Sequence, residues 1–285
     1  MKMRKYTDEE LHTLQQIELE ILREFIRVCE KLGLDYFADG GTALGAVRHQ
    51  GFIPWDDDVD VGMTRENYQV FLKEAPALLP ATISLHSPYN DPRNPCYYSK
   101  LRYNGTKFVD DSTHRLDINK GIYIDIFPFD EVPDDERLNI RQFRQFQRWT
   151  RLLTLRQFGD LDSPPEGIKQ KAKAAVRRAA YFAAQMIPYG MMLARMDRIA
   201  TMYNGTGQSA YSTLPAPKRN WDYFRADGYK PFVKLKFETL ELNMLNDYDA
   251  YLRSQYDDYM QPPPEDQREN HAPYVLDFGS WESGR

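Results

Sequence analysis

The first long pattern in the chain is a run of apolar and charged side chains with a helical period. Between residues 8 and 33 the apolar positions recur mostly every three or four residues, with charged residues between them, which predicts an amphipathic helix. Thr7 followed by Glu10 has the spacing of a capping box at the start of this helix, and Gly33 is suited to end it.

Shorter apolar runs predict strands that alternate with helices through the first 130 residues. Strands are expected at 34–38, 59–61, 97–103, 106–109 and 121–127, and helices at 42–49 and 65–79. The dipeptide Asn104-Gly105 predicts a hairpin between two of these strands, and Pro128 is expected to end the last one. The mixture predicts an α+β fold, in which helices flank a mixed β-sheet core.

The second half of the chain is expected to be mainly helical. Helices are predicted over 134–157, over 168–202 with a break at Pro188 and Gly190, and over 238–259, while 160–167 has the composition of a linker. We therefore expect three regions. Residues 1–133 form an α+β core, and residues 134–236 form a basic and mainly helical region. Residues 237–285 form a C-terminal helical segment whose tail packs back on the core.

Composition and charge narrow the class of protein. The chain has 285 residues, of which 13% are aromatic, so a disordered protein is excluded. Lys and Arg total 37 against 42 Asp and Glu, and this net charge of −5 argues against nucleic acid as the main partner. Cys29 and Cys96 form no disulfide framework, and no run suits a membrane span or a signal peptide, so we expect a cytoplasmic protein.

Three aspartates in apolar runs are the strongest candidates for chemistry. Asp58 and Asp60 flank Val59 on an expected strand, so both carboxylates point to one face. Paired carboxylates repel unless a cation lies between them, and they commonly hold Mg²⁺ against phosphates. Asp125 lies in another apolar strand, where it is a third ligand, a general base or a paired core residue. A solvated acidic loop is the alternative for 56–58.

The segment before these aspartates suits a phosphate group. Gly40 and Gly41 precede an expected helix start at Thr42, and glycines at a helix N-terminus let an anion approach the backbone. Other cations could bind the remaining phosphate charge or could be solvated surface residues, namely Arg48, His49, Lys100 and Arg102.

Two motifs resemble the signature of the LicD family. The first is DGGTALGAVRH at 39–49 followed by GFIPWDDDVDV at 51–61, and the second is GIYIDIFPFD at 121–130. The resemblance implies the nucleotidyltransferase fold, and hence a nucleotidyltransferase-like catalytic core at 1–133.

The end of the chain also resembles this family. Residues 248–263, followed by Arg268 and His271, match its usual ending, although Asp257 stands where the family pattern has glycine, so that turn is expected to differ. Arg268 and His271 either close over the active site or bind the polar end of the preceding helix. Trp55 either stacks on a cytosine base or packs the loop.

The resemblance implies a phosphotransferase that decorates cell-surface glycans such as teichoic acid or lipopolysaccharide. Phosphocholine from CDP-choline is the expected group, with CMP released, and CDP-ribitol or CDP-glycerol is the alternative donor. Asp58, Asp60 and Asp125 match the family's metal ligands for one or two Mg²⁺ ions, and Gly40 and Gly41 match its glycine pair. The same residues would also suit a true nucleotidyltransferase that releases pyrophosphate, and a non-catalytic glycan-binding module is a third possible function.

The helices expected after residue 134 carry many cations. Between Arg137 and Arg178 these cations are opposed by few carboxylates, and 168–202 adds apolar side chains. Such helices could contact the inner face of the cytoplasmic membrane at 168–202, bind an anionic glycan or lipid-linked glycan acceptor, or pack on the core with a solvated cationic rim.

Overall fold

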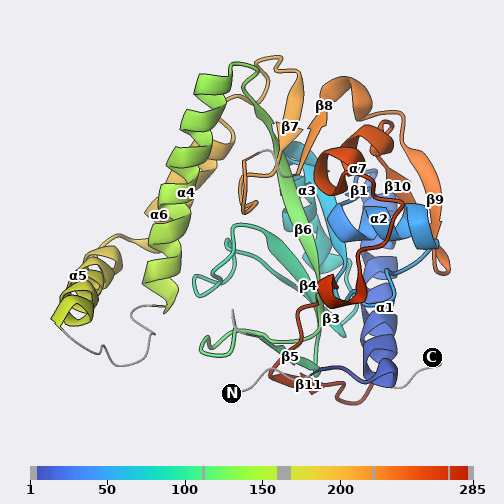
Figure 1. Ribbon diagram of the computed structural model, residues 1–285, viewed down its shortest axis with the longest axis horizontal. Coiled ribbons are helices and arrows are strands. Elements are labelled where there is room, and N and C mark those ends of the chain that lie inside the picture. The colour runs from blue at the N-terminus through green and yellow to red at the C-terminus, as the bar shows by residue number, and fades with distance from the viewer. Residues whose placement is uncertain (1–4, 111–112, 159–167, 220–221, 269, 282–285) are drawn as a thin grey trace.

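A mixed sheet of seven strands forms the centre of the fold (Figure 1). The computed structural model describes residues 5–110, 113–158, 168–219, 222–268 and 270–281. The strands of this sheet are β1 (Phe37–Ala38), β2 (Asp60–Thr64), β3 (Ile83–His86), β4 (Ser99–Tyr103), β6 (Tyr123–Val132), β7 (Ala210–Ser212) and β8 (Tyr223–Arg225). Their order is β1-β2-β6-β4-β3, with β7 paired to β6 and β8 to β7. β2 and β6 are parallel and the other pairs are antiparallel, which confirms the predicted α+β class.

Helices and two small sheets complete the fold. The helices are α1 (Asp8–Leu32), α2 (Gly40–His49), α3 (Arg65–Glu74), α4 (Glu136–Phe158), α5 (Ile168–Gln185), α6 (Tyr189–Ala200) and α7 (Tyr248–Tyr256). Short 3₁₀ turns are η1 (Ala75–Ala77), η2 (Ala226–Gly228) and η3 (Glu265–Gln267). The small sheets pair β9 (Val233–Phe237) with β10 (Leu240–Met244), and β5 (Lys107–Val109) with β11 (Val275–Asp277).

The first predicted helix is confirmed with both of its ends. The Thr7 hydroxyl accepts the Glu10 N–H while the Glu10 carboxylate accepts the Thr7 N–H, and Gly33 ends the helix with a left-handed φ of 64°. The buried face of α1 contacts β4 and β6, so the apolar stripe seen in the sequence packs on the sheet.

The predicted hairpin across Asn104-Gly105 is wrong. Gly105 has a φ of 85°, so the chain does turn there, but β4 and β5 do not pair with each other. Both edges of β4 are occupied, by β3 on one side and by β6 on the other. The strand β5 pairs instead with β11, which comes from the C-terminal tail.

Pro128 does not end its strand, because β6 continues to Val132. The N–H of Asp125 points to β2, where it donates to the carbonyl of Val59 at 2.8 Å. Strand alternation then turns the nitrogen of Pro128 to the opposite edge of β6. On that edge the pairing with β4 reaches Ile126 and the pairing with β7 begins at Asp130, so proline occupies a gap between two partners.

The helix predicted over 238–259 is also wrong in its first part. Leu240, Leu242 and Met244 alternate with polar residues, and this period of two forms β10 of a hairpin with β9. Helix α7 follows at Tyr248–Tyr256, with the Asp247 carboxylate accepting the N–H of Ala250 at its start. Leu242, Met244 and Leu252 all belong to the core under the large sheet.

The region 134–236 contains both a helical group and part of the central sheet. Helix α4 contacts both α5 and α6, and the three helices stand to one side of the sheet in Figure 1, with the break at Pro188 as predicted. The segment 210–225 returns to the sheet as β7 and β8. The predicted linker at 160–167 lies outside the described residues. Among the helices that the structure describes, none has the length and apolarity to cross a bilayer.

Candidate functional site

Asp58, Asp60 and Asp125 meet where the two parallel strands begin. Asp60 is the first residue of β2, and its register partner across the sheet is Asp125 of β6. Asp58 lies two residues earlier, in the loop that enters β2. The strand is shifted from the predicted 59–61 to Asp60–Thr64, but both aspartates stay beside Asp125.

Burial and mutual repulsion raise the pKa values of these carboxyl groups. The pKa of Asp60 is well above its usual value because the group is buried and because Asp58 and Asp125 carry like charge. Burial also raises the pKa of Asp125 and Asp58, and it raises that of Asp56 to about 8 with help from Asp58. Burial and like charge therefore favour the protonated form of these carboxyl groups, and a bound cation would favour the ionised form.

Gly41 makes room for the Asp56 carboxylate, and Gly40 supplies a positive φ at the start of α2. α2 begins at Gly40 and not at Thr42 as predicted, and Gly40 has a positive φ of 47°. A methyl group on Gly41 would lie 2.8 Å from a carboxylate oxygen of Asp56, and one on Gly40 would lie 3.5 Å from that of Asp60. The Thr42 hydroxyl accepts the N–H of Asp60 at 2.8 Å, which fixes the start of β2 against α2.

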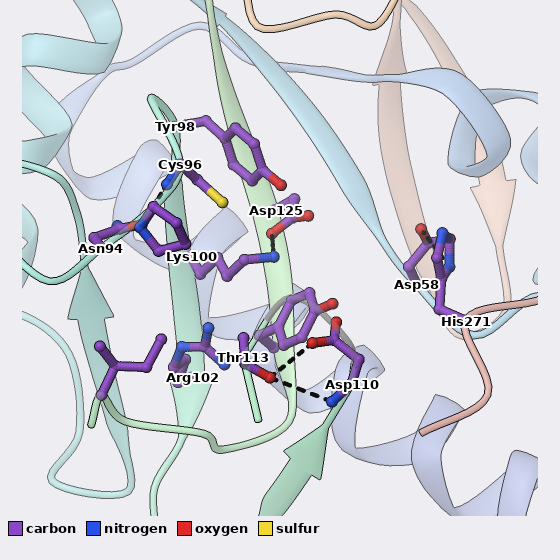
Figure 2. Close-up of a pocket in the computed structure, with 13 residues that line it drawn as sticks. Asp58, Asn94, Cys96, Tyr98, Lys100, Arg102, Asp110, Thr113, Asp125 and His271 are labelled. Atoms are coloured by element: carbon purple, nitrogen blue, oxygen red, sulfur yellow. Dashed lines mark hydrogen bonds and ion pairs between the residues drawn. The ribbon is translucent and has the colours of Figure 1, made fainter. Parts of the chain in front are cut away.

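A pocket of about 220 Å³ opens beside Asp58 and Asp125 (Figure 2). Its charged and aromatic lining residues are Asp58, Tyr98, Lys100, Arg102, Asp110, Tyr123, Asp125 and His271. Asp58 and His271 lie on one side of the view, and Lys100 and Asp125 lie on the other. The pocket therefore combines the acidic cluster with cations, and with two tyrosine rings that the sequence analysis did not single out.

Lys100 and Arg102 share a face of β4, as predicted, but both are buried. The Lys100 ammonium forms an ion pair with Asp125, its cross-strand neighbour, and lies 3.5 Å from the centre of the Tyr123 ring. The contact uses Oδ1 of Asp125. Arg102 stacks 4.8 Å from the same ring and donates to the carbonyl of Gly121 at 2.8 Å.

Lowering the pH from 8 to 5 is expected to destabilise the protein through His86, by about 2 kcal/mol. Burial, followed by the Arg102 charge, lowers the pKa of His86 to about 4, and Arg102 donates to its Nδ1 at 3.3 Å. The unfolded state takes up the proton near pH 6.5 and the folded state resists it, so stability is lost as the pH falls from 6.5 towards 4. Urea unfolding at pH 8 and pH 5 measures the free energy of unfolding, which should fall further in the wild type than in His86→Gln. An equal fall in both proteins would contradict the prediction.

His271 reaches the acidic cluster from the C-terminal tail. Its backbone N–H donates to the buried Asp57 carboxylate at 2.9 Å, and its Nδ1 lies 3.2 Å from Asp57 and 3.5 Å from Asp58. Tyr6, before α1, also donates to Asp57, at 2.6 Å. The hydrogen bond to Asp57 raises the pKa of His271 to about 9, so the imidazole is charged at neutral pH and lies against Asp58.

Glu18 is a buried acid that the sequence analysis missed. It lies on the apolar face of α1 and is 2% exposed, and one of its carboxyl oxygens has no hydrogen-bond partner. Burial raises its pKa well above the usual value, and the charges of Asp58 and Asp57 add to this effect. The signal was present in the sequence, because a single glutamate interrupts an otherwise apolar helix stripe.

The remaining predicted residues form a separate group and do not line this pocket. Trp55 lies between two guanidinium groups, with Arg268 at 4.3 Å and Arg48 at 6.0 Å from its ring. Arg48 also donates to the Tyr259 carbonyl at 2.8 Å and to the ring of His49 at 2.9 Å. In this arrangement Trp55 packs against cations of the chain itself.

The turn at Asp257 keeps the conformation that suits glycine. Asp257 has a φ of 52°, so the backbone is unusual for a residue with a side chain. Asp257 therefore adopts a positive φ although it is not a glycine.

The carboxylate oxygens suit Mg²⁺, a hard cation that prefers oxygen ligands. Within the described part of the chain, the group whose ligand atoms all lie within 4.8 Å of one another is Asp57, Asp58 and His271, and not the predicted trio. Asp57 is already engaged by Tyr6 and His271. Asp58 belongs to this group and to the predicted trio, and His271 lies 3.5 Å from it.

Comparison with known proteins identifies a domain that contains the three aspartates. Residues 33–164, which include all three aspartates, match the family described as LicD/FKTN/FKRP, nucleotidyltransferase domain. Residues 33–164 thus match a nucleotidyltransferase domain of this family, which supports the resemblance seen in the sequence over this part of the chain.

The similar proteins include transferases of phosphate-linked groups. The chain is 29% identical over 290 residues to the lipopolysaccharide cholinephosphotransferase LicD of Haemophilus influenzae, covering 96% of this chain and 100% of that protein. It is 46% identical to human ribitol 5-phosphate transferase FKRP, but over only 48 residues, which are 17% of this chain and 10% of that protein. An uncharacterized protein of Rickettsia prowazekii is 30% identical over 121 residues, 40% of each chain.

Proposed function

We propose that this protein is a Mg²⁺-dependent phosphotransferase that moves phosphocholine from a CDP-linked donor to a sugar hydroxyl of a cell-surface glycan precursor. The observation that carries the proposal is the buried carboxylate cluster of Asp58, Asp60 and Asp125, whose pKa values are raised by burial, beside an open pocket. The similarity to a cholinephosphotransferase along nearly the whole chain supports the chemical class.

Asp58, Asp60 and Asp125 would hold one or two Mg²⁺ ions, which would neutralise the charge of the donor diphosphate. The acceptor oxygen attacks the phosphorus that carries the headgroup, the bond from that phosphorus to the bridging oxygen breaks, and CMP leaves. The proton of the acceptor hydroxyl passes to a general base, which is the alternative role of Asp125. Lys100, paired with Asp125, and His271, beside Asp58, keep these two carboxylates oriented at the pocket.

Two features of the pocket favour a cationic headgroup over ribitol or glycerol. The rings of Tyr98 and Tyr123 line it, and the Lys100 ammonium lies 5.2 Å and 3.5 Å from their centres, so these rings already accommodate one cation. Asp110 is a third carboxylate in this lining, beside Asp58 and Asp125, and the three face the cations Lys100, Arg102 and His271. A quaternary ammonium makes no strong hydrogen bonds, and aromatic faces and carboxylates are the groups that attract it.

The test is a thermal-shift panel with Mg²⁺ and CDP-choline, CDP-ribitol, CDP-glycerol or CTP. A ligand at about 100 times its Kd is expected to raise the melting temperature by about 5 °C, and CDP-choline should do so in Mg²⁺ but not in EDTA. In a product assay, release of CMP would support phosphotransfer and release of pyrophosphate would identify a nucleotidyltransferase. Binding of CDP-ribitol in place of CDP-choline would contradict the proposal that the headgroup is choline. A protein that binds no metal would favour the non-catalytic glycan-binding module.

A further inference from the structure

Four of the nine large apolar side chains that are exposed in the described part of the chain lie on one helical hairpin. Val176, Phe182, Met186 and Met191 are all exposed, with Met186 at 85%, and they lie within α5, the turn after it and the start of α6. In Figure 1 this hairpin is at one end of the molecule, with α5 outermost and far from the site. Scattered exposed apolar residues are normal, whereas a group of them on one element marks an interaction surface.

These residues form a continuous stripe along α5. Spacings of three and four residues place one set of exposed side chains on the same face of the helix and of the turn that follows it. We name this set the α5 stripe, and its members are Ala175, Val176, Ala179, Phe182, Ala183 and Met186. An amphipathic helix normally turns such a stripe to the core, and α5 turns it outwards.

The outward orientation is fixed by contacts on the other side of the hairpin. The Arg156 side chain, from α4, donates to the carbonyls of Ala184, Gln185 and Ile187 at 3.0–3.1 Å. The Gln185 side chain donates back to the carbonyl of Arg156 at 2.8 Å, and Ala184 is fully buried. Helix α5 therefore rests on α4 through its C-terminal end while the stripe stays open.

We propose that the α5 stripe lies on an anionic lipid bilayer. Lys173 and Arg178 are exposed on α5 to either side of the stripe, and Arg177 adds a third cation, so the helix has a positive polar face with no carboxylate between 168 and 196. This charge complements anionic headgroups, and the apolar stripe suits the boundary between headgroups and acyl chains. No described helix can span a bilayer, so the contact is interfacial. This membrane contact does not depend on the proposed phosphotransferase function.

The test is co-sedimentation of the full chain with vesicles of phosphatidylcholine alone or with one-third phosphatidylglycerol. We expect binding to the anionic vesicles that weakens as salt rises. Val176→Glu/Phe182→Glu should lower the partition coefficient at least tenfold, and Lys173→Gln/Arg178→Gln should lower it by about fivefold per cation. Val70→Glu/Leu138→Glu is the matched control, because these side chains are exposed and apolar but lie on α3 and α4, and it should bind as the wild type does.

Three outcomes would overturn the proposed membrane contact. These outcomes are no binding to anionic vesicles at low salt, equal binding of the stripe variant, and a wild-type dimer in light scattering that the stripe variant converts to a monomer. The last would make the stripe an interface between two copies. Circular dichroism and donor binding in solution should be unchanged in the stripe variant, so a failure of membrane binding is separable from a failure of the proposed function.

Discussion

Replacing Asp60 by Asn is expected to reduce transfer by at least about a thousandfold, which corresponds to roughly 4 kcal/mol of activation free energy. Asp60 stands opposite Asp125 in the strand register and two residues from Asp58, so its loss removes one of three carboxylates around the proposed cation. Removing it also relieves repulsion, so the metal-free variant should melt at a higher temperature than the wild type. Activity and melting temperature, each with and without Mg²⁺, measure both effects.

The pH dependence of the metal-free protein provides an independent check. The folded pKa of Asp60 is above the unfolded value, so the folded state binds more protons, and stability is lost as the pH rises from the unfolded pKa through the folded pKa. Mg²⁺ should oppose this fall, and Asp60→Asn should lose most of the stabilisation by Mg²⁺.

A matched control is Asp222→Asn, outside the pocket. Burial raises the pKa of Asp222 to about 8, and Gln255 donates to it at 2.9 Å. This variant also removes a buried carboxyl group, but it should keep the response to Mg²⁺. Full activity of Asp60→Asn would disprove the metal role of Asp60.

Replacing Asp130 by Ala is expected to lower the free energy of unfolding by about 3–5 kcal/mol. Asp130, on β6, accepts two hydrogen bonds from Arg65 of α3, at 3.0 and 2.5 Å, and one from Asn204 at 2.7 Å. Asp130 is 1% exposed and Arg65 is 6% exposed. Without its carboxylate partner the guanidinium stays buried and unpaired, which costs far more than the loss of a surface ion pair.

Urea unfolding of Asp130→Ala measures this cost. The double variant Arg65→Met/Asp130→Leu is the control, because it removes both charges and should lose much less than the sum of the single variants. A loss below about 1 kcal/mol in Asp130→Ala would contradict the prediction, since that is the range of exposed pairs.

Local signals in the sequence predicted the elements whose stability is local. The capping box at Thr7 and the glycine at residue 33 bound α1 correctly because their hydrogen bonds join residues a few positions apart. The hairpin at Asn104-Gly105 failed because the partner of a strand is decided elsewhere in the chain. The helix predicted across Leu240–Met244 failed because a short apolar run fits either period.

The sequence by itself determined the candidate carboxylates, the glycine pair and the resemblance to a family, because these depend on residue identity and short spacing. Only the tertiary structure decided that Asp60 faces Asp125, that Lys100 pairs with Asp125 and that His271 reaches Asp58 from the C-terminal tail. It also decided that the α5 stripe points outwards. These outcomes depend on strand register and on helix packing between residues far apart in the chain, and such contacts leave no trace in local sequence patterns.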